Sequence, residues 1–228
     1  MISDFHTHSF FSDGVLLPSE LIRRAVVAGY GVIAVTDHAG PGNLEEVLGQ
    51  LARECEVARN HWPIVALPGV ELTHVPPGSI AELARRARSA GAAVVVVHGE
   101  TIAEPVEPGT NSAAIDAEEV DILAHPGLIT SEEAERAAQR GCFIEISARK
   151  SHAYANGHVS SVVRAAGGRL LLNSDCHEPG DLLSSRFQRL VLLGAGIPER
   201  EHATILTENP RELLARVLPR LKGASGGD

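Results

Sequence analysis

The sequence predicts an α/β fold in which seven parallel strands close into one (β/α) barrel. Seven short runs rich in Val, Ile, Leu and Ala alternate with helical patterns along nearly the whole chain. Near-continuous apolar runs are typical of parallel strands that are buried on both faces. The chain has 228 residues, a length that suits a single domain of this architecture. Histidine and acidic residues stand at the downstream ends of the runs, and closure into a barrel would bring these ends together.

The predicted strands are short and end in a polar residue or a Gly/Pro turn. They span Ile2–His8, Gly31–His38, Ile64–Leu72, Ala92–His98, Val120–His125, Cys142–Ser147 and Arg169–His177. Amphipathic stretches between them predict helices over Pro18–Ala28, Leu44–Asn60, Ser79–Ser89, Ser131–Gln139 and Gly157–Ala166. A glycine follows four of these stretches, which is the usual signal for the end of a helix.

The last part of the chain continues the helical pattern. Residues Arg189–Leu221 are predicted to be mostly helical, with Asn209 and Pro210 at the start of the final helix. We expect one barrel domain over residues 1–222, followed by a flexible, Gly-rich tail over residues 223–228. No GxGxxG or GxxxxGKS/T motif follows a predicted strand, so a nucleotide-binding open sheet lacks support.

Charge and cysteine content limit the class of protein. The formal net charge of −9 argues against a general binder of nucleic acids or anionic membranes, because both require basic surfaces. The three cysteines are widely spaced and form no CxxC pair, as is typical of reduced intracellular thiols. A strand-like segment follows Met1 directly, and no apolar run reaches membrane-spanning length. We therefore expect a cytoplasmic protein without a signal peptide or a membrane partner.

Histidine and acidic residues gather where the predicted strands end. His6 and His8 point to the same face of the first strand, because side chains two residues apart share a face. Asp175 and His177 repeat this arrangement on the last strand. The predicted metal ligands are His6, His8, Asp13, His38, Glu71, His98, His125, Asp175 and His177. Imidazoles and carboxylates without a thiolate suit Zn, Mn or Fe. Nine ligands exceed the needs of one ion, so we predict two or three divalent ions, with Glu71 suited to bridge a pair.

In the order of its motifs the chain resembles the polymerase and histidinol phosphatase (PHP) family of metal-dependent phosphoesterases. The matching segments are Asp4-Phe-His6-Thr-His8-Ser9, Ser12-Asp13-Gly14, Thr36-Asp37-His38, Gly69-Val-Glu71, His98, His125-Pro126-Gly127 and Ser174-Asp175-Cys-His177. They cover essentially the whole chain. The resemblance implies a distorted seven-stranded (β/α)7 TIM-like barrel that carries a trinuclear metal site.

The resemblance also distributes the ligands among three metal positions. It implies a first ion on His6, His8, Glu71 and Asp175, a second on Glu71, His98 and His125, and a third on Asp13, His38 and His177. Asp13 stands where some family members have His and others have Asp. The identity and the occupancy of the third ion therefore stay open.

A phosphoesterase reaction follows from such a site. Bound divalent ions would make the mouth of an acidic protein attractive to anions, and a phosphate ester fits such a mouth. We expect hydrolysis of small phosphomonoesters, histidinol phosphate or nucleotide-like, by a metal-activated hydroxide. Asp175 and His177 are the candidate catalytic residues for proton transfer, while the general acid for the leaving group stays open. The candidate substrate-binding residues are Arg149, Arg186 and His74.

Three alternatives stay open at this stage. A phosphodiesterase or nuclease would use the same chemistry on short or cyclic nucleotides. Aromatic residues make up only 4% of the chain and basic tracts are absent, so we expect no binding of extended nucleic acid. An amidohydrolase-type C–N hydrolase commonly has a modified Lys or a carboxylate where this chain has His98. A non-catalytic PHP-like module would be expected to lose ligands that are all present here. The substrate, the metal and the oligomeric state are not fixed by the sequence.

Overall fold

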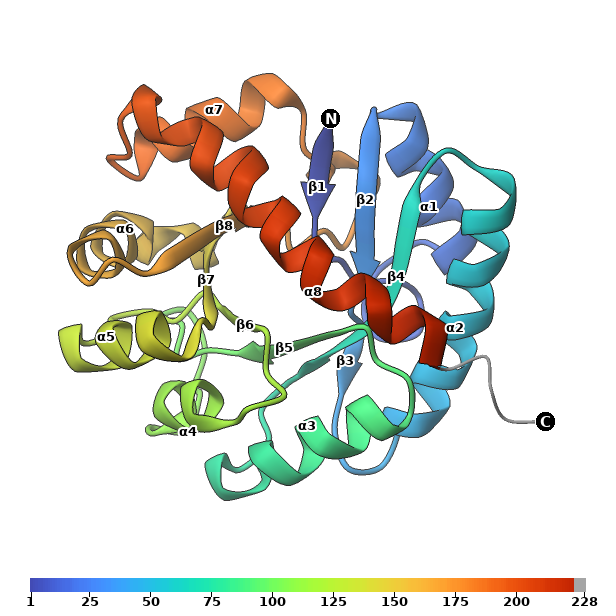
Figure 1. Cartoon of the computed structure of the whole chain (residues 1–228), viewed down its shortest axis with the longest axis horizontal. Helices are drawn as coiled ribbons and strands as arrows, with labels where there is room; N and C mark the ends of the chain where they lie inside the picture. Colours follow the sequence, from blue (N-terminus) through green and yellow to red (C-terminus); the bar gives the residue numbers. More distant parts are fainter. Residues whose placement is uncertain (224–228) are drawn as a thin grey trace.

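The structure is a computed structural model that describes residues 1–223, and it contains the predicted single-domain barrel (Figure 1). Parallel strands follow one another in the order β1-β2-β4-β5-β6-β7-β8. Their bounds are β1 (Ile2–Asp4), β2 (Tyr30–Val35), β4 (Val65–Leu72), β5 (Val94–His98), β6 (Ile122–Ala124), β7 (Phe143–Ser147) and β8 (Arg169–Asn173). A short strand, β3 (His38–Ala39), pairs with β4 after the chain leaves β2. The predicted seven-stranded (β/α)7 barrel is confirmed, with β2 and β3 as two parts of one interrupted strand.

The barrel is distorted at the seam between β1 and β8. Within residues 1–223, the sheet pairing at this seam is an isolated parallel bridge between Thr7 and Cys176. Deeper in the seam, the Phe5 N–H donates to the Asn173 side chain at 3.0 Å. Asp4 accepts a hydrogen bond from the backbone of the opposite strand at 3.2 Å. Because side chains replace part of the backbone ladder here, β1 and β8 end earlier than the predicted strands.

Helices surround the barrel. They are α1 (Pro18–Val27), α2 (Leu44–His61), α3 (Ile80–Ser89), α4 (Thr110–Asp116), α5 (Ser131–Arg140), α6 (Asn156–Ala165), α7 (Ser185–Gly194) and α8 (Asn209–Gly223). The five helices predicted from amphipathic stretches agree with the structure to within one residue at each end. Helix α4 was not predicted, because it is short and follows a loop rich in Pro and Gly.

The C-terminal helical segment differs from its prediction. The stretch Arg189–Leu221 is divided between α7 and α8, with a helical turn, Thr204–Glu208, leading directly into α8. Helix α8 extends to Gly223, so the expected boundary after residue 222 falls inside its last turn. Residues 224–228 of the predicted flexible tail lie outside the described residues.

Helix α8 closes the amino end of the barrel. The barrel interior contains an apolar cluster that includes Leu67, Ile122 and Phe143 from three different strands. Leu213 and Val217 of α8 belong to the same cluster, and Figure 1 shows α8 crossing the barrel from α7 toward α2. The buried face of α8 therefore completes the core at this end.

A buried ion cluster accompanies α8 at the amino end. Asp121 immediately precedes β6 and is 2% exposed. Its carboxylate accepts hydrogen bonds from Arg88 of α3 and from Arg220 of α8, the latter at 3.0 Å. Arg220 also donates to the Ala93 carbonyl at 2.8 Å. Two guanidinium groups of the chain thus neutralise this buried carboxylate.

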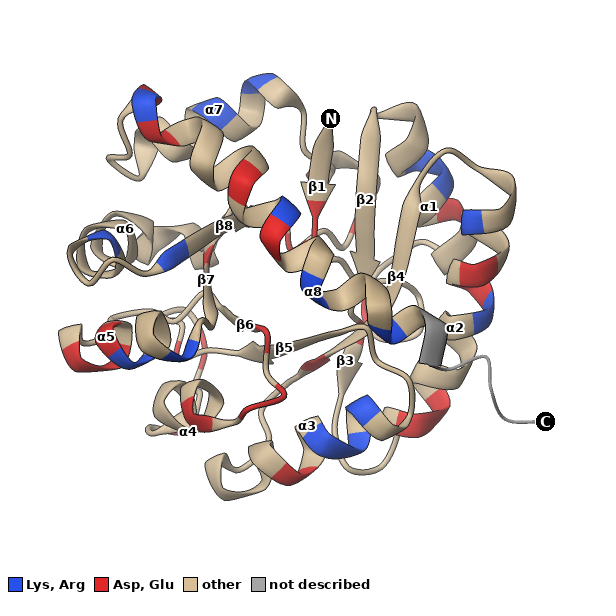
Figure 2. Ribbon diagram, in the orientation of Figure 1, with Lys and Arg blue, Asp and Glu red and all other residues tan. Residues whose placement is uncertain are grey.

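The outer surface carries charges of both signs. Figure 2 shows acidic and basic residues interspersed along the outer helices and along α8. Within residues 1–223, no helix combines the length and the apolar character that are needed to cross a lipid bilayer.

Candidate metal centre

The carboxyl end of the barrel, opposite α8, holds the histidine and acidic side chains singled out by the sequence. Alternate residues of a strand point to the same face. The inward-pointing side chains of one strand therefore run from the apolar core to the carboxyl end of the barrel. On β4, Leu67 and Glu71 share the interior face, and on β5, Val94 and His98 do so. The strands that build the apolar core therefore also position the polar group at the mouth.

Four buried side chains form the pocket expected for a first ion: His6, His8, Glu71 and Asp175. The Nε2 atom of His6 lies 3.3 Å from Glu71 Oε1, and the Nε2 atom of His8 lies 3.2 Å from Asp175 Oδ1. The rings of His6 and His8 are 5.0 Å apart between centroids. The structure brings these four predicted residues together.

Glu71 also borders the second pocket, beside His98 and His125. Its Oε1 atom lies 3.4 Å from His125 Nε2, so one carboxylate oxygen faces a histidine of each pocket. The rings of His98 and His125 are 4.4 Å apart between centroids. The donor atoms of Glu71 group with those of His6 and His125, and the donor atoms of His98 group with those of His125 and His152, so His125 joins the two groups.

The third pocket lies nearer the surface. The Oδ1 atom of Asp13 lies 3.3 Å from His38 Nε2 and 3.0 Å from His177 Nε2. The turn that carries Asp13 is fixed by Asp37, whose carboxylate accepts a hydrogen bond from the Ser12 hydroxyl at 2.6 Å. The side chain of Asp13 is 55% exposed, so this pocket is the most accessible of the three.

Glu145 on β7 is a site residue that was not predicted. Its buried carboxylate lies 2.7 Å from His6 Nδ1 and accepts a hydrogen bond from the Asn173 side chain at 3.0 Å. A carboxylate behind a ligating histidine fixes the orientation of the ring, and here it directs His6 Nε2 into the first pocket. The signal in the sequence is an isolated Glu within an apolar strand, two residues from Phe143 and thus on the interior face.

Two further residues outside the predicted ligand set approach the second pocket from loops. His152, in the turn η2 (His152–Ala155), stacks on His125 with ring centroids 4.0 Å apart. Glu104, in the loop after β5, lies 3.2 Å from His98 Nε2 and 3.1 Å from His74 Nε2. Neither residue has a clear sequence signal, because both lie outside periodic elements.

The predicted substrate-binding residues fall in two different places. Arg149 and His74 line the mouth, a cavity of about 270 Å³. The Arg149 guanidinium donates to the Asp175 carbonyl at 3.1 Å and stands at the rim. Arg186 lies in the first turn of α7 and borders a separate hollow beside Leu190. The structure does not bring Arg186 to the mouth, because this arginine lies on helix α7 and lines a different hollow.

Burial and mutual contact shift the ionisation of the site. Burial alone would lower the pKa of His6, but the nearby carboxylates, Glu145 foremost, raise this pKa well above its ordinary value. For the carboxyl group of Glu71 burial acts in the opposite direction and would raise the pKa. His6 and neighbouring histidines nevertheless hold this pKa well below its usual range. In contrast, burial lowers the pKa of His8 to about 4. Glu71 thus stays ionised, and its negative charge is balanced by protonated histidines such as His6.

Three non-glycine residues in the described part of the chain have a left-handed backbone, and all three border the mouth. The φ angles are 50° at His74, 26° at His125 and 53° at Asp175. Such conformations cost about 1 kcal/mol or more for residues with a side chain. Backbone strain of this kind concentrates at functional sites, where the surrounding structure holds it in place.

The donor atoms of the site fit divalent metal ions. Several buried nitrogen and oxygen atoms lack a hydrogen-bond partner among residues 1–223: His6 Nε2, both ring nitrogens of His8, Glu71 Oε1, His125 Nδ1 and Glu145 Oε1. Burying an unsatisfied polar atom is unfavourable by about 1–3 kcal/mol. Imidazole nitrogens and carboxylate oxygens are ligands of Zn, Mn and Fe, so cations in the first two pockets would satisfy His6 Nε2, His8 Nε2 and Glu71 Oε1.

Comparisons of sequence place the chain among known proteins. No family model matches the chain. It is 46% identical over 215 residues to an uncharacterised protein of Methanocaldococcus jannaschii, covering 94% of this chain and 99% of that protein. It is 31% identical over 144 residues to the 5'-3' exoribonuclease Rnm of Escherichia coli, covering 62% of this chain. The match spans 44% of the exoribonuclease, less than half of that enzyme.

Comparisons of structure show the fold. The histidinol phosphate phosphatase of Lactococcus lactis, in complex with Zn, L-histidinol and phosphate, has a TM-score of 0.60 at 18% identity, covering 86% of this chain and 94% of the phosphatase. The ochratoxinase of Aspergillus niger also has a TM-score of 0.60, at 13% identity, covering 94% of this chain and 71% of that enzyme. The fold alone thus does not separate hydrolase classes, and the side chains at the mouth must do so.

Proposed function

The chain belongs to the polymerase and histidinol phosphatase (PHP) family, and from this premise we propose that it is a metal-dependent phosphoesterase that hydrolyses small phosphomonoesters. The observation that carries the proposal is the position of Glu71. One oxygen of its buried carboxylate lies 3.3 Å from His6 Nε2 and 3.4 Å from His125 Nε2. A carboxylate between two such pockets is suited to bridge a pair of divalent ions, an arrangement used for displacement at phosphorus.

Each pocket would hold one ion. The proposed ligands are His6, His8, Glu71 and Asp175 for the first ion, Glu71, His98 and His125 for the second, and Asp13, His38 and His177 for the third. When bound, divalent ions would acidify a water molecule and neutralise phosphate oxygens. Zn, Mn and Fe each suit this set of ligand types.

Arg149 is the proposed phosphate contact of the chain itself. Its planar guanidinium matches the spacing of phosphate oxygens, and its side chain is 31% exposed at the rim. Asp175 and His177 are the proposed groups for proton transfer. Asp175 Oδ1 lies 3.4 Å from His177 Nδ1, and this ring nitrogen also lies 2.9 Å from the Asp175 carbonyl, so the two proposed groups adjoin each other at the mouth.

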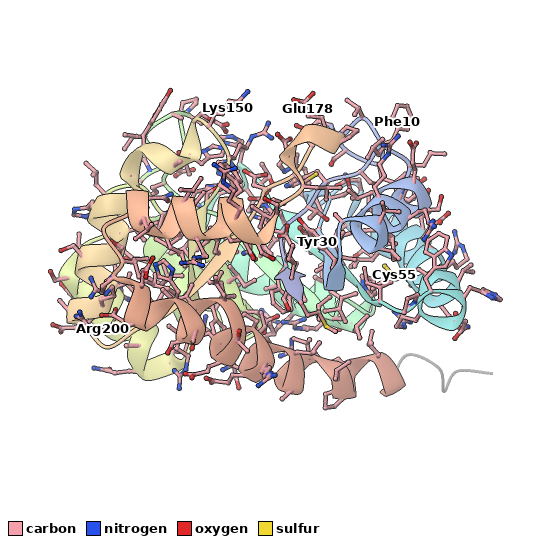
Figure 3. The ribbon with its side chains drawn as sticks, turned by 90° about the horizontal axis from the view of Figure 1, so that it is seen from above. Phe10, Tyr30, Cys55, Lys150, Glu178 and Arg200 are labelled. Atoms are coloured by element: carbon pink, nitrogen blue, oxygen red, sulfur yellow. The ribbon has the colours of Figure 1, made fainter. Side chains whose placement is uncertain are left out.

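A second hollow supports a leaving group larger than a small alcohol. Arg149 and His177 line both the mouth and this hollow, which has a volume of about 360 Å³ and also contains Val15, Lys150 and Tyr154. The Tyr154 side chain is 74% exposed and offers an aromatic face on which a planar group can stack. In Figure 3, Lys150 and Glu178 lie near the edge of the molecule opposite α8. A nucleotide-like substrate would fit this arrangement, with its phosphate at the mouth and its base in the hollow.

Hydrolysis of phosphodiesters in short nucleic acids is the second candidate function. The sequence similarity to an exoribonuclease over 144 residues favours it. The hollow beside Arg149 would then hold the nucleotide next to the scissile bond. An acidic chain with interspersed surface charges still disfavours long nucleic acids.

A hydrolysis screen with metal-replete protein tests both candidates. We expect phosphate release from phosphomonoesters, including nucleotides, with Mn, Zn or Fe supplied, and loss of this activity in the matched variant Glu71→Gln. Activity restricted to diesters would replace the first candidate with the second. No hydrolysis of either class, or full activity in the Glu71→Gln variant, would refute the proposal.

A further inference from the structure

Glu104 carries an inference about how the second pocket is completed. We propose that Glu104 is a ligand of the ion in the second pocket, that this ion thereby latches the loop between β5 and α4 over the mouth, and that substrate phosphate displaces the Glu104 carboxylate. The inference rests on the proposed function, because it takes metal ions and phosphate as the occupants of the mouth.

The distances from Glu104 match those between the other ligand atoms. Its Oε2 atom lies 3.2 Å from His98 Nε2, and its Oε1 atom lies 3.5 Å from His152 Nε2. Two donor atoms at about 2.1 Å from one tetrahedral ion are about 3.4 Å apart. In the first pocket the corresponding separation between His8 and Asp175 is 3.2 Å. Glu104 is therefore spaced from His98, a proposed ligand of the second ion, as one ligand is spaced from another, and its donor atoms group with those of His98 and His74.

The histidine nitrogens that face Glu104 are those directed into the pocket. The Nδ1 atom of His98 lies 3.2 Å from the Gly99 carbonyl, which leaves Nε2 toward the pocket. The Nδ1 atom of His152 lies 2.8 Å from the Thr101 hydroxyl, with the same result. Anchoring one ring nitrogen in this way is how proteins direct the other nitrogen toward a metal. Thr101 and Glu104 belong to the same loop, so one segment both orients His152 and supplies the carboxylate.

The loop is fixed at its base and exposed to solvent at its tip. The Glu100 carboxylate accepts hydrogen bonds from the N–H groups of Gly109 and Asn111, each at 2.9 Å. At Gly99 a Cβ atom would lie 2.3 Å from the Ala124 carbonyl oxygen, so glycine permits the close passage of the chain over β6. Between these ends the side chain of Glu104 remains 39% exposed. A fixed base with an exposed tip suits a segment that opens and closes.

Displacement follows from the charge of the incoming group. Glu104 and Arg149 line the same cavity of about 270 Å³, so a phosphate bound to Arg149 would approach the Glu104 carboxylate. Two anions in contact repel each other, and the ligands Glu71 and Asp175 are buried whereas Glu104 is partly exposed. The loop carboxylate is therefore the one that moves when phosphate enters.

Metal binding to matched variants tests the ligand role without measuring catalysis. Glu104→Gln removes the proposed ligand, and Glu107→Gln removes the same charge from an exposed position of the same loop. In Mn²⁺ titrations by calorimetry, we expect one ion to bind Glu104→Gln about tenfold or more weakly, and Glu107→Gln to match the wild type. Equal Mn²⁺ affinities in the two variants and the wild type would overturn the proposal.

Hydrogen exchange in the wild-type protein tests the latch without any substitution. We expect Mn²⁺ to slow amide exchange over residues 99–109, and inorganic phosphate to accelerate it again in the Mn²⁺-loaded protein. Amide exchange rates over residues 99–109 that do not change with Mn²⁺, or that fall further when phosphate is added, would overturn the proposed latch. A protein that shows both responses but hydrolyses no phosphoester would refute the proposed function alone, whereas hydrolysis without either response would refute the latch alone.

Discussion

The two ends of the barrel bury carboxylates and neutralise them in different ways. At the amino end, Asp121 is held by two guanidinium groups of the chain, Arg88 and Arg220. At the carboxyl end, Glu71 is buried just as completely but faces histidine nitrogens, and one of its oxygens has no hydrogen-bond partner in the described chain. The amino end is complete once the chain folds, whereas the carboxyl end is arranged to receive cations from solution.

This difference predicts a division between stability and activity. Removing one partner from a buried ion cluster leaves uncompensated charge and destabilises the fold. Removing a carboxylate that awaits a cation should instead remove the cation. Substitutions at the two ends should therefore separate the two properties.

The largest effect is expected for Glu71→Gln. Loss of the bridging carboxylate should lower kcat/KM for phosphomonoesters by about 10³-fold or more, because metal ions contribute several kcal/mol to stabilising the transition state. Without metal, the free energy of unfolding should fall less than on loss of Asp121, since the histidines around Glu71 can release their protons whereas Arg88 and Arg220 stay charged. Steady-state kinetics and urea unfolding in chelator measure the two quantities. A variant that keeps a tenth of the wild-type activity would contradict the bridging role of Glu71.

At the amino end, Asp121→Asn should destabilise the protein by about 3–5 kcal/mol, because Arg88 and Arg220 lose their buried partner. The matched control is Asp116→Asn, which removes an exposed partner of Arg136 and should lower stability by at most about 1 kcal/mol. Urea unfolding measures both, and kcat per folded molecule should stay at the wild-type level. Similar losses in the two variants would mean that the buried cluster has no special role.

Arg149→Ala should produce a smaller effect at the mouth. Loss of the charged hydrogen bonds to phosphate, about 1.5–3 kcal/mol, should raise KM about 10- to 100-fold at saturating Mn²⁺, a condition needed because Arg149 also contacts His177 Nδ1 at 2.6 Å. Arg186→Ala is the control, because Arg186 borders a separate hollow, and its KM should match the wild type. Equal effects of the two substitutions would contradict the assignment of Arg149 as the phosphate contact.

Strand periodicity explains which parts of the site the sequence could predict. His6 and His8 share a strand face, and His98 ends a continuous apolar strand, so their directions follow from a two-residue period. Glu145 obeys the same rule, and an isolated acid in an apolar strand was a usable signal. His152 and Glu104 lie in a turn and a loop, where no period fixes the direction of a side chain.

At the amino end of the barrel, too, part of the structure could not be predicted from the sequence pattern. The helical character of the C-terminal segment followed from its sequence, but the closure of the barrel by α8 did not. That closure depends on contacts of Leu213, Val217 and Arg220 with strands far away in the chain. Local patterns specify elements, whereas the packing of one element across the others is decided by long-range contacts.

The smallest predicted effect concerns pH. Burial raises the pKa of Asp4 from 3.8 to about 6, so between these values the folded state holds a proton that the unfolded state releases. The contribution of Asp4 to stability is therefore greatest at low pH and falls as pH rises from about 4 to 6. In metal-free protein, Asp4→Asn should remove up to about 2 kcal/mol of this dependence. Urea unfolding across this range measures it, and an unchanged slope in the variant would contradict the assignment.

The contrast between the two ends depends on the carboxyl end being a metal centre completed by ions from solution. Elemental analysis combined with thermal unfolding of the wild type and Glu71→Gln, each with and without Mn²⁺, measures whether it is one. We predict two or three ions per wild-type chain, a stabilisation of about 3–4 kcal/mol at free Mn²⁺ between 100 and 1,000 times Kd, and loss of at least one ion in the variant. Fewer than one tightly bound ion per wild-type chain, with unfolding unaffected by Mn²⁺, would contradict it.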